Sequence, residues 1–167
     1  MYQQGEMVVY GIHGVCRVTG QETRMVDRKT VMYLVLEPVG QEGTRYLVPS
    51  HNAAAMGKLS PMLKPEELDA LICSDAVRCS SWIGDENVRK QTYRELISSG
   101  DRVGLMRMIH ALYRHGNAQK KAGKKFHMAD ENFLRDAERL LAGEISMIKG
   151  ISQEEAKIII RTKLNEE

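Results

Sequence analysis

The chain of 167 residues lacks the features of a membrane, exported or disulfide-bonded protein. No uncharged apolar run approaches the roughly 20 residues that a membrane helix needs. The first residues show no basic stretch followed by an apolar one, so we expect no signal peptide. Three cysteines are an odd number, and Cys73 and Cys79 do not have the spacing of a zinc knuckle. We therefore expect free thiols, no bound metal and a cytoplasmic location.

Catalytic motifs are also missing. There is no glycine-rich dinucleotide loop and no Gly-x-Ser-x-Gly elbow. The segment from Gly116 to Gly123 has six residues between its glycines where a phosphate loop has four. None of the five histidines forms an i, i+4 pair of the kind that binds zinc on a helix. We predict no catalytic residue, no cofactor and no small-molecule substrate, so an enzyme is the weakest function class.

The composition is that of a globular protein, with 43% hydrophobic and 28% charged residues. The net charge is only +2, but it is unevenly distributed. Residues 101–127 carry seven basic side chains and one acidic side chain, a local charge of +6. Such a segment is a candidate contact for a polyanion.

The first 50 residues have the pattern of β-strands. Four runs rich in Val, Tyr, Thr and Leu cover residues 6–11, 15–24, 30–39 and 44–49, with tight polar turns between them. In the third run Met32, Leu34, Leu36 and Pro38 form an apolar face that we expect to line the core. Cys16 is expected to be a small core residue. The pattern predicts an antiparallel meander or small barrel with no room for an internal ligand.

A helical pattern follows. We predict a short helix over residues 65–73, helices capped by Asp85 and Asp101, and a last helix opened by a Ser152–Glu155 capping box. Between them an apolar stripe marks a further long helix, with members Leu134, Ala137, Leu141, Ile145 and Ile148. The fold class is α+β: a small β module over residues 1–55, a linker with a short helix over 56–83, and an all-α helical bundle over 84–167.

Several blocks of the sequence resemble a known family. Gly5-Glu6-Met7-Val8-Val9-Tyr10, His13-Gly14-Val15, Tyr33-Leu34-Val35-Leu36 and Val48-Pro49 are similar to the RNA-polymerase-interacting domain of the CarD/CdnL family. The transcription-repair coupling factor contains the same module. Further along, Trp82, Ser99-Gly100-Asp101 and Leu140-Leu141-x-Gly-Glu144 occur in the order found in CarD-like regulators.

The resemblance implies a bacterial, nucleoid-associated transcription regulator. Its Tudor-like N-terminal domain would dock on the β subunit of RNA polymerase. Its helical domain would contact promoter DNA at the upstream edge of the −10 element, where the family's tryptophan wedges into the minor groove and stabilises the open complex. No membrane takes part in this function.

The resemblance also identifies candidate contacts with polymerase. Arg24 matches a basic residue of the family's contact, although by itself it reads as a solvated turn charge. A second contact, often basic in the family, falls on Leu47, just before Val48-Pro49. Arg45 could supply that charge from the same face of the strand. We assign polymerase binding to Arg24, Arg45, Leu47 and Pro49.

The candidate DNA contacts are Trp82 and nearby basic residues. A lone tryptophan is more often a packing residue than a ligand, so Trp82 has two readings, a wedge or a packed ring. It is expected to lie on the loop before a helix. We assign phosphate contacts to Arg89, Lys90, Lys124 and Lys125, although the lysines around Gly123 could equally form a solvated loop.

Two function classes therefore remain. The first is a regulator that binds polymerase and also contacts promoter DNA non-specifically, through charge and shape rather than base edges. The alternative is an adaptor of the same family whose helical domain binds a protein and not DNA. A salt series separates them, because binding through phosphates weakens steeply as salt rises.

Overall fold

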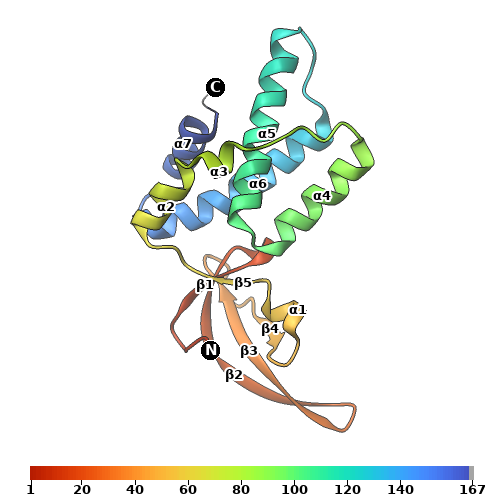
Figure 1. Ribbon diagram of the computed structural model, residues 1–167. Helices are drawn as coiled ribbons and strands as arrows, with labels where there is room; N and C mark the ends of the chain where they lie inside the picture. The colour runs from red at the N-terminus through yellow and green to blue at the C-terminus, as the bar shows by residue number, and fades with distance from the viewer. Residues whose placement is uncertain (166–167) are drawn as a thin grey trace. The chain divides into compact units, whose positions relative to one another are not determined.

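The computed structural model describes residues 1–165, which form two compact units. The first unit is Met1–Met62 and the second begins at Leu63. The first is built mainly from strands and the second only from helices, so the predicted α+β class is confirmed. Figure 1 gives the element labels used below.

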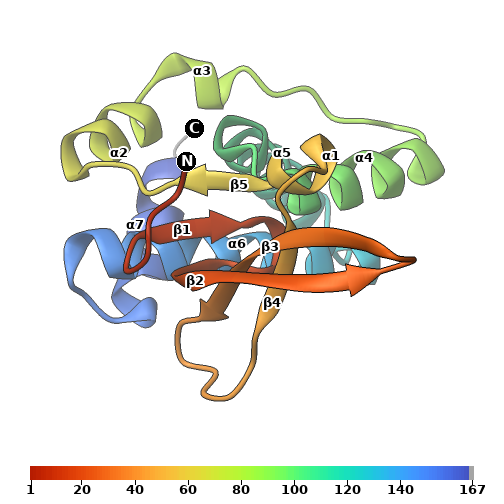
Figure 2. The same ribbon diagram turned by 90° about the horizontal axis from the view of Figure 1, so that it is seen from below.

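The first unit contains a five-stranded antiparallel sheet. Its strands are β1 (Met7–Tyr10), β2 (Val15–Val26), β3 (Lys29–Pro38), β4 (Tyr46–Pro49) and β5 (Leu59–Pro61), and their order is β4-β3-β2-β1-β5. A 3-10 turn, η1 (Gly11–His13), joins β1 to β2, and a short helix, α1 (Ala53–Met56), precedes β5. The sheet is a four-stranded meander with β5 added beside β1, as Figure 2 shows. The meander agrees with the sequence prediction.

The β2–β3 hairpin is long and turns tightly. Val26 pairs with Lys29, so only Asp27 and Arg28 form the turn. Both have positive φ, 49° and 64°, as a two-residue type I′ turn requires. The hairpin extends well beyond the rest of its sheet in Figure 1.

One face of the sheet carries the apolar core of the first unit. Its buried side chains are Val8, Cys16, Val18, Leu34, Leu36, Val48 and Leu59. Cys16 is a core residue as predicted, and burial raises the pKa of its thiol to about 11. The prediction was wrong for Met32, whose side chain is 49% exposed. Met32 pairs with Thr23 on the part of the hairpin that runs past the core, so its apolar face has nothing to pack on.

The second unit contains six helices within the described residues. They are α2 (Pro65–Ile72), α3 (Asp75–Arg78), α4 (Glu86–Ser99), α5 (Arg102–Lys121), α6 (Met128–Lys149) and α7 (Gln153–Leu164). The predicted caps are present, because Asp85, Asp101 and Ser152 each accept a backbone N–H three residues on. Gly100 and Gly150 end α4 and α6 in the left-handed conformation that favours glycine.

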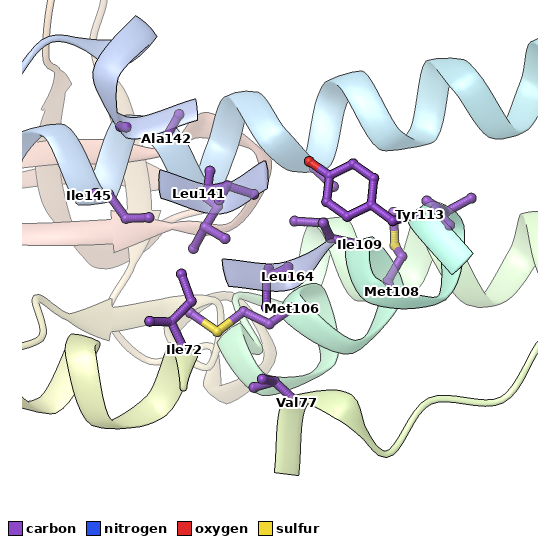
Figure 3. Close-up of a cluster of buried hydrophobic side chains, with 14 of the residues drawn as sticks. Ile72, Val77, Met106, Met108, Ile109, Tyr113, Leu141, Ala142, Ile145 and Leu164 are labelled. Atoms are coloured by element: carbon purple, nitrogen blue, oxygen red, sulfur yellow. The ribbon is translucent and has the colours of Figure 1, made fainter. Parts of the chain in front are cut away.

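The helices surround a second apolar core. Side chains from α2, α3, α5, α6 and α7 meet there, as Figure 3 shows, and the largest fully buried ones are Leu68, Met106, Ile109, Leu112, Leu141, Ile145, Ile160 and Leu164. Ile72 and Val77 bring α2 and α3 into this core. The segment predicted as a linker, 56–83, is therefore divided between the units: β5 completes the sheet, and α2 and α3 belong to the bundle.

Within residues 1–165, no helix is long and apolar enough to cross a membrane.

Candidate functional site

In the first unit the candidate contacts share the sheet face opposite the core. The register places Glu22 beside Tyr33 and Tyr33 beside Pro49 across β2, β3 and β4. Leu47 lies two residues from Pro49 and therefore points to the same side. We call this the outer sheet face, and it also carries the side chains of Arg24 and Arg45.

A carboxylate joins the two arginines on this face. Arg24 Nε donates to Glu22 Oε1 at 2.8 Å, and Arg45 Nη2 donates to Glu22 Oε2 at 2.9 Å. Each arginine side chain is still 51% exposed. The hydrogen bond from Arg24, followed by that from Arg45, lowers the pKa of Glu22, which stays ionised. The structure thus brings Arg24 and Arg45 together through a residue that the sequence analysis did not single out.

The strand β4 forms one edge of the sheet and pairs only with β3 among the described strands. Leu47 and Pro49 lie on it and are both half-buried. An edge strand leaves backbone groups available to a strand from another protein. The outer sheet face and this edge together place two exposed cations beside half-buried apolar side chains.

In the second unit Trp82 lies on the loop between α3 and α4, residues 79–85, as expected. We call this segment the Trp82 loop. The indole stacks on the imidazole of His115, with ring centroids 3.6 Å apart and planes within 3° of parallel. The Arg89 guanidinium also lies over the indole, 4.5 Å from the ring centroid. Trp82 is half-buried, so it is neither a fully solvated wedge nor a residue enclosed in the core.

The expectation that Arg89 contacts a DNA phosphate needs correction. The residue is only 6% exposed, and its Nε and Nη2 donate to the two oxygens of Asp130 at 2.8 and 3.1 Å. Its Nη1 donates to the carbonyl of Ile83 at 2.9 Å. These donors are already used inside the protein, so Arg89 holds the Trp82 loop in place and does not fit the role of a phosphate contact.

The Trp82 loop is fixed to α5 at a second point. Ser80 Oγ lies 2.7 Å from His110 Nδ1. Burial lowers the pKa of His115, with Asp130 opposing and Arg89 reinforcing the shift, so the ring beneath Trp82 is neutral near pH 7. A neutral imidazole can lie flat on the indole without placing a second cation beside Arg89.

The Arg89–Asp130 pair also shows where the exposed lysines lie in the helical unit. Asp130 is in the first turn of α6, and this helix directly follows residues 122–127, which we call the lysine loop. Because Arg89 is in the first turn of α4, the pair joins the starts of the two helices. The Trp82 loop and the lysine loop precede these two starts and therefore lie at the same end of the bundle.

Lys124 and Lys125 are exposed on the lysine loop. The next residue, Phe126, packs its ring beside Gly116 of α5. Lys90 is half-exposed and forms an i, i+4 ion pair with Glu86. The structure thus places Trp82, Lys124 and Lys125 on two loops at the same end of the helical unit. It also adds His115 and Asp130, which no motif in the sequence indicates.

Within residues 1–165, no group of three His, Cys, Asp or Glu side chains is arranged to hold a metal ion.

Two family comparisons match most of the chain. Residues 2–60 match the CarD-like/TRCF RID domain, and residues 80–161 match the CarD C-terminal domain. The first domain implies interaction with RNA polymerase, and the two occur here in the order that the sequence blocks indicate. The chain therefore belongs to the CarD family of transcription factors, which are not enzymes.

Proposed function

We propose that this protein binds the β subunit of RNA polymerase through its outer sheet face and the β4 edge. The support is the pairing of Arg24 and Arg45 through Glu22 next to a strand with an open edge. A strand from the partner can add to β4 by backbone hydrogen bonds. Leu47 and Pro49 supply apolar contact, and the two arginines favour an acidic neighbour.

The helical unit, in this proposal, contacts promoter DNA at the upstream edge of the −10 element and stabilises the open complex. The observation that carries this is the position of Trp82. Its indole is held on a surface loop by His115 and Arg89, at the end of the bundle where Lys124 and Lys125 are exposed. A planar apolar ring can enter a distorted base step in the minor groove while lysines neutralise phosphates.

A salt series with charge-reversal variants tests DNA binding. The measurement is fluorescence anisotropy of labelled duplexes of unrelated sequence with the full chain. We expect Lys124→Glu with Lys125→Glu to weaken every duplex about equally, because phosphate contacts carry no base information. The dependence of log affinity on log salt should become shallower by about 2. The matched control is Arg135→Glu with Arg139→Glu, two exposed residues of α6.

DNA binding that does not weaken as salt rises, and that Lys124→Glu with Lys125→Glu leaves unchanged, would contradict the DNA contact. In that case the helical unit would serve the adaptor function and bind a protein partner. Co-purification of the tagged full chain with polymerase, with and without Arg24→Glu, tests the first unit separately.

A further inference from the structure

A cavity of about 310 Å³ in the helical unit lies among the second half of α5, the lysine loop and α6. Its described lining consists of one stripe of α5, Lys124 and Phe126 of the lysine loop, and Leu134 of α6. We call it the Phe126 cavity. Its volume is at the lower end of the roughly 300–1,000 Å³ typical of small-molecule sites, so it suits one compact group.

The α5 side of the Phe126 cavity is apolar and held in place. Leu112 and Tyr113 line it and are both buried. The ring of Tyr113 lies between α5 and α6 (Figure 3), and its hydroxyl donates to Glu138 Oε1 of α6. The polar group of Tyr113 is therefore already hydrogen-bonded, and the residue adds aromatic surface to the wall.

Phe126 forms another wall of the cavity. Gly116 of α5 leaves room for its ring, because a Cβ at that position would lie 3.5 Å from Phe126 Cε2, an ordinary contact distance. Phe126 and Leu134 are both half-buried, so part of each side chain stays accessible. An accessible aromatic ring in an apolar cavity is the kind of surface on which a planar group stacks.

The mouth of the cavity carries lysines. Lys120, in the last turn of α5, and Lys124 line the cavity and are exposed. A lysine can lay its methylene stem along apolar surface while its ammonium group stays in water. The backbone N–H of Lys124 donates to the carbonyl of Gln119 at 2.8 Å, which ties the lysine loop to α5. Lys124 therefore has a fixed backbone position where the cavity meets solvent.

The place of the cavity in the bundle relates it to DNA. Phe126 and Lys124 belong to the lysine loop, which lies at the same end of the bundle as the Trp82 loop. The inference rests on the proposed function, because a unit at the upstream edge of the −10 element lies where the duplex begins to open and bases become unpaired. Bases of any sequence stack on aromatic side chains. Proteins that take a base out of the duplex hold it in a close-fitting pocket between aromatic and apolar side chains.

We propose that the Phe126 cavity receives one unpaired base of the promoter, which stacks on Phe126 while Lys120 and Lys124 contact the phosphates beside it. Trp82 acts at the distorted base step, and the cavity holds a base that the opening releases. The site accepts any base, because stacking does not read the base edge. It therefore stabilises opened DNA without selecting a sequence.

The test measures the affinity of the full chain for three labelled DNAs by fluorescence anisotropy at one salt concentration. The first is a perfect duplex, the second carries a single bulged adenine, and the third has an abasic nucleotide in place of that adenine. The bulged and abasic DNAs have the same phosphates, so the ratio of their Kd values, abasic over adenine, measures capture of the base. We expect a ratio of about 5 or more for the wild-type chain, as stacking of one base on an aromatic ring supplies.

Two variants change the cavity without changing its charge. Phe126→Leu removes the ring but keeps an apolar wall, and Leu134→Trp fills the cavity with a larger side chain. Both should lower the ratio below about 2 and leave affinity for the perfect duplex within about twofold, because the lysines are unchanged.

The matched control is Phe133→Leu. Phe133 is the chain's other phenylalanine, is also half-buried, and packs its ring against Tyr93 outside the cavity lining. This variant should keep the wild-type ratio. Thermal unfolding of all three variants checks that the bundle is intact.

A wild-type ratio near 1 overturns the proposal, and so does a ratio that Phe126→Leu and Leu134→Trp leave unchanged. A ratio that falls in Trp82→Ala but not in Phe126→Leu assigns the base to Trp82 and also overturns it. Salt-dependent binding of the perfect duplex with a ratio near 1 removes the base site and leaves the proposed DNA contact intact, whereas failure to bind all three DNAs removes both. A ratio near 1 with loss of polymerase association in Phe126→Leu would assign the cavity to a side chain of a protein partner instead.

Discussion

The imidazole of His115 lies flat beneath the indole of Trp82, with the two ring centroids 3.6 Å apart. This contact joins the middle of α5 to a loop that has no regular structure of its own. It explains how a half-buried tryptophan can keep one orientation on a surface loop.

Removing the stacked ring should release the tryptophan. We expect His115→Ala to destabilise the protein by only about 0.5–1.5 kcal/mol, the usual value of an aromatic pair. Quenching of the single tryptophan by acrylamide should increase, since the indole loses a covering ring. His115→Phe keeps a planar partner and should stay close to wild type. Quenching that is unchanged in His115→Ala would mean that the stack does not position Trp82.

The same contact predicts a pH dependence. The pKa of His115 is lowered in the folded state, chiefly by burial, so the unfolded chain takes up the proton first. The stabilisation is therefore complete above the unfolded value of about 6.5 and is lost as the pH falls below it. His110 shifts in the same direction and adds to the effect. Chemical denaturation between pH 5 and pH 8 should show stability rising with pH, with a smaller rise in His115→Phe.

The ion pair between Arg89 and Asp130 should contribute more to stability than the stacking of His115 on Trp82. Both side chains are almost fully buried, and the contact is bidentate. Asp130→Ala leaves the Arg89 charge buried without its partner, so we expect a loss of about 3–5 kcal/mol in urea denaturation. Replacing both residues, as Arg89→Met with Asp130→Leu, should cost less because no charge is left unpaired. A double variant as unstable as Asp130→Ala would contradict this account.

On the outer sheet face the expected effect is on binding and not on stability. Arg24→Glu should weaken association with the polymerase β subunit and leave the melting temperature nearly unchanged, because exposed ion pairs contribute little to folding. Lys58→Glu is the matched control, since Lys58 is exposed next to β5, at the opposite edge of the sheet from β4. Pull-downs unaffected by Arg24→Glu and Arg45→Glu together would remove both residues from the interface.

Local signals in the sequence predicted the parts of the fold that local physics determines. The caps at Asp85, Asp101 and Ser152 were predictable because a capping side chain bonds to backbone only three residues away. The β5 strand was not, because three residues ending in proline show no periodicity. Met32 followed the alternation, yet alternation cannot tell where a long hairpin leaves its core.

The candidate site likewise has residues that the sequence indicates and residues that only the structure reveals. Trp82 and the lysines stand out in the sequence by their rarity and their charge. The residues that hold Trp82 and its loop in place do not stand out in the sequence, because the contacts are between distant positions. Arg89 and Asp130 are 41 residues apart, and Trp82 and His115 are 33 residues apart. The sequence suggested that Arg89 contacts phosphate because it is a cation near Trp82. Only the packing of α4 against α6 reveals that its charge is used inside the bundle.

The last prediction separates the two readings of Trp82. Because the indole is half-buried, Trp82→Ala should cost clearly less than the about 3–5 kcal/mol that a fully buried tryptophan would lose. On a fork-junction promoter the same variant should shorten the lifetime of the open complex, since no ring fills the distorted base step. Polymerase binding should persist, because that contact is proposed for the first unit. Trp82→Phe, which keeps a smaller ring on His115, should retain part of the open-complex lifetime. A large loss of stability, with a proportional loss of every activity, would instead make Trp82 a structural residue and leave DNA to the lysine loop alone.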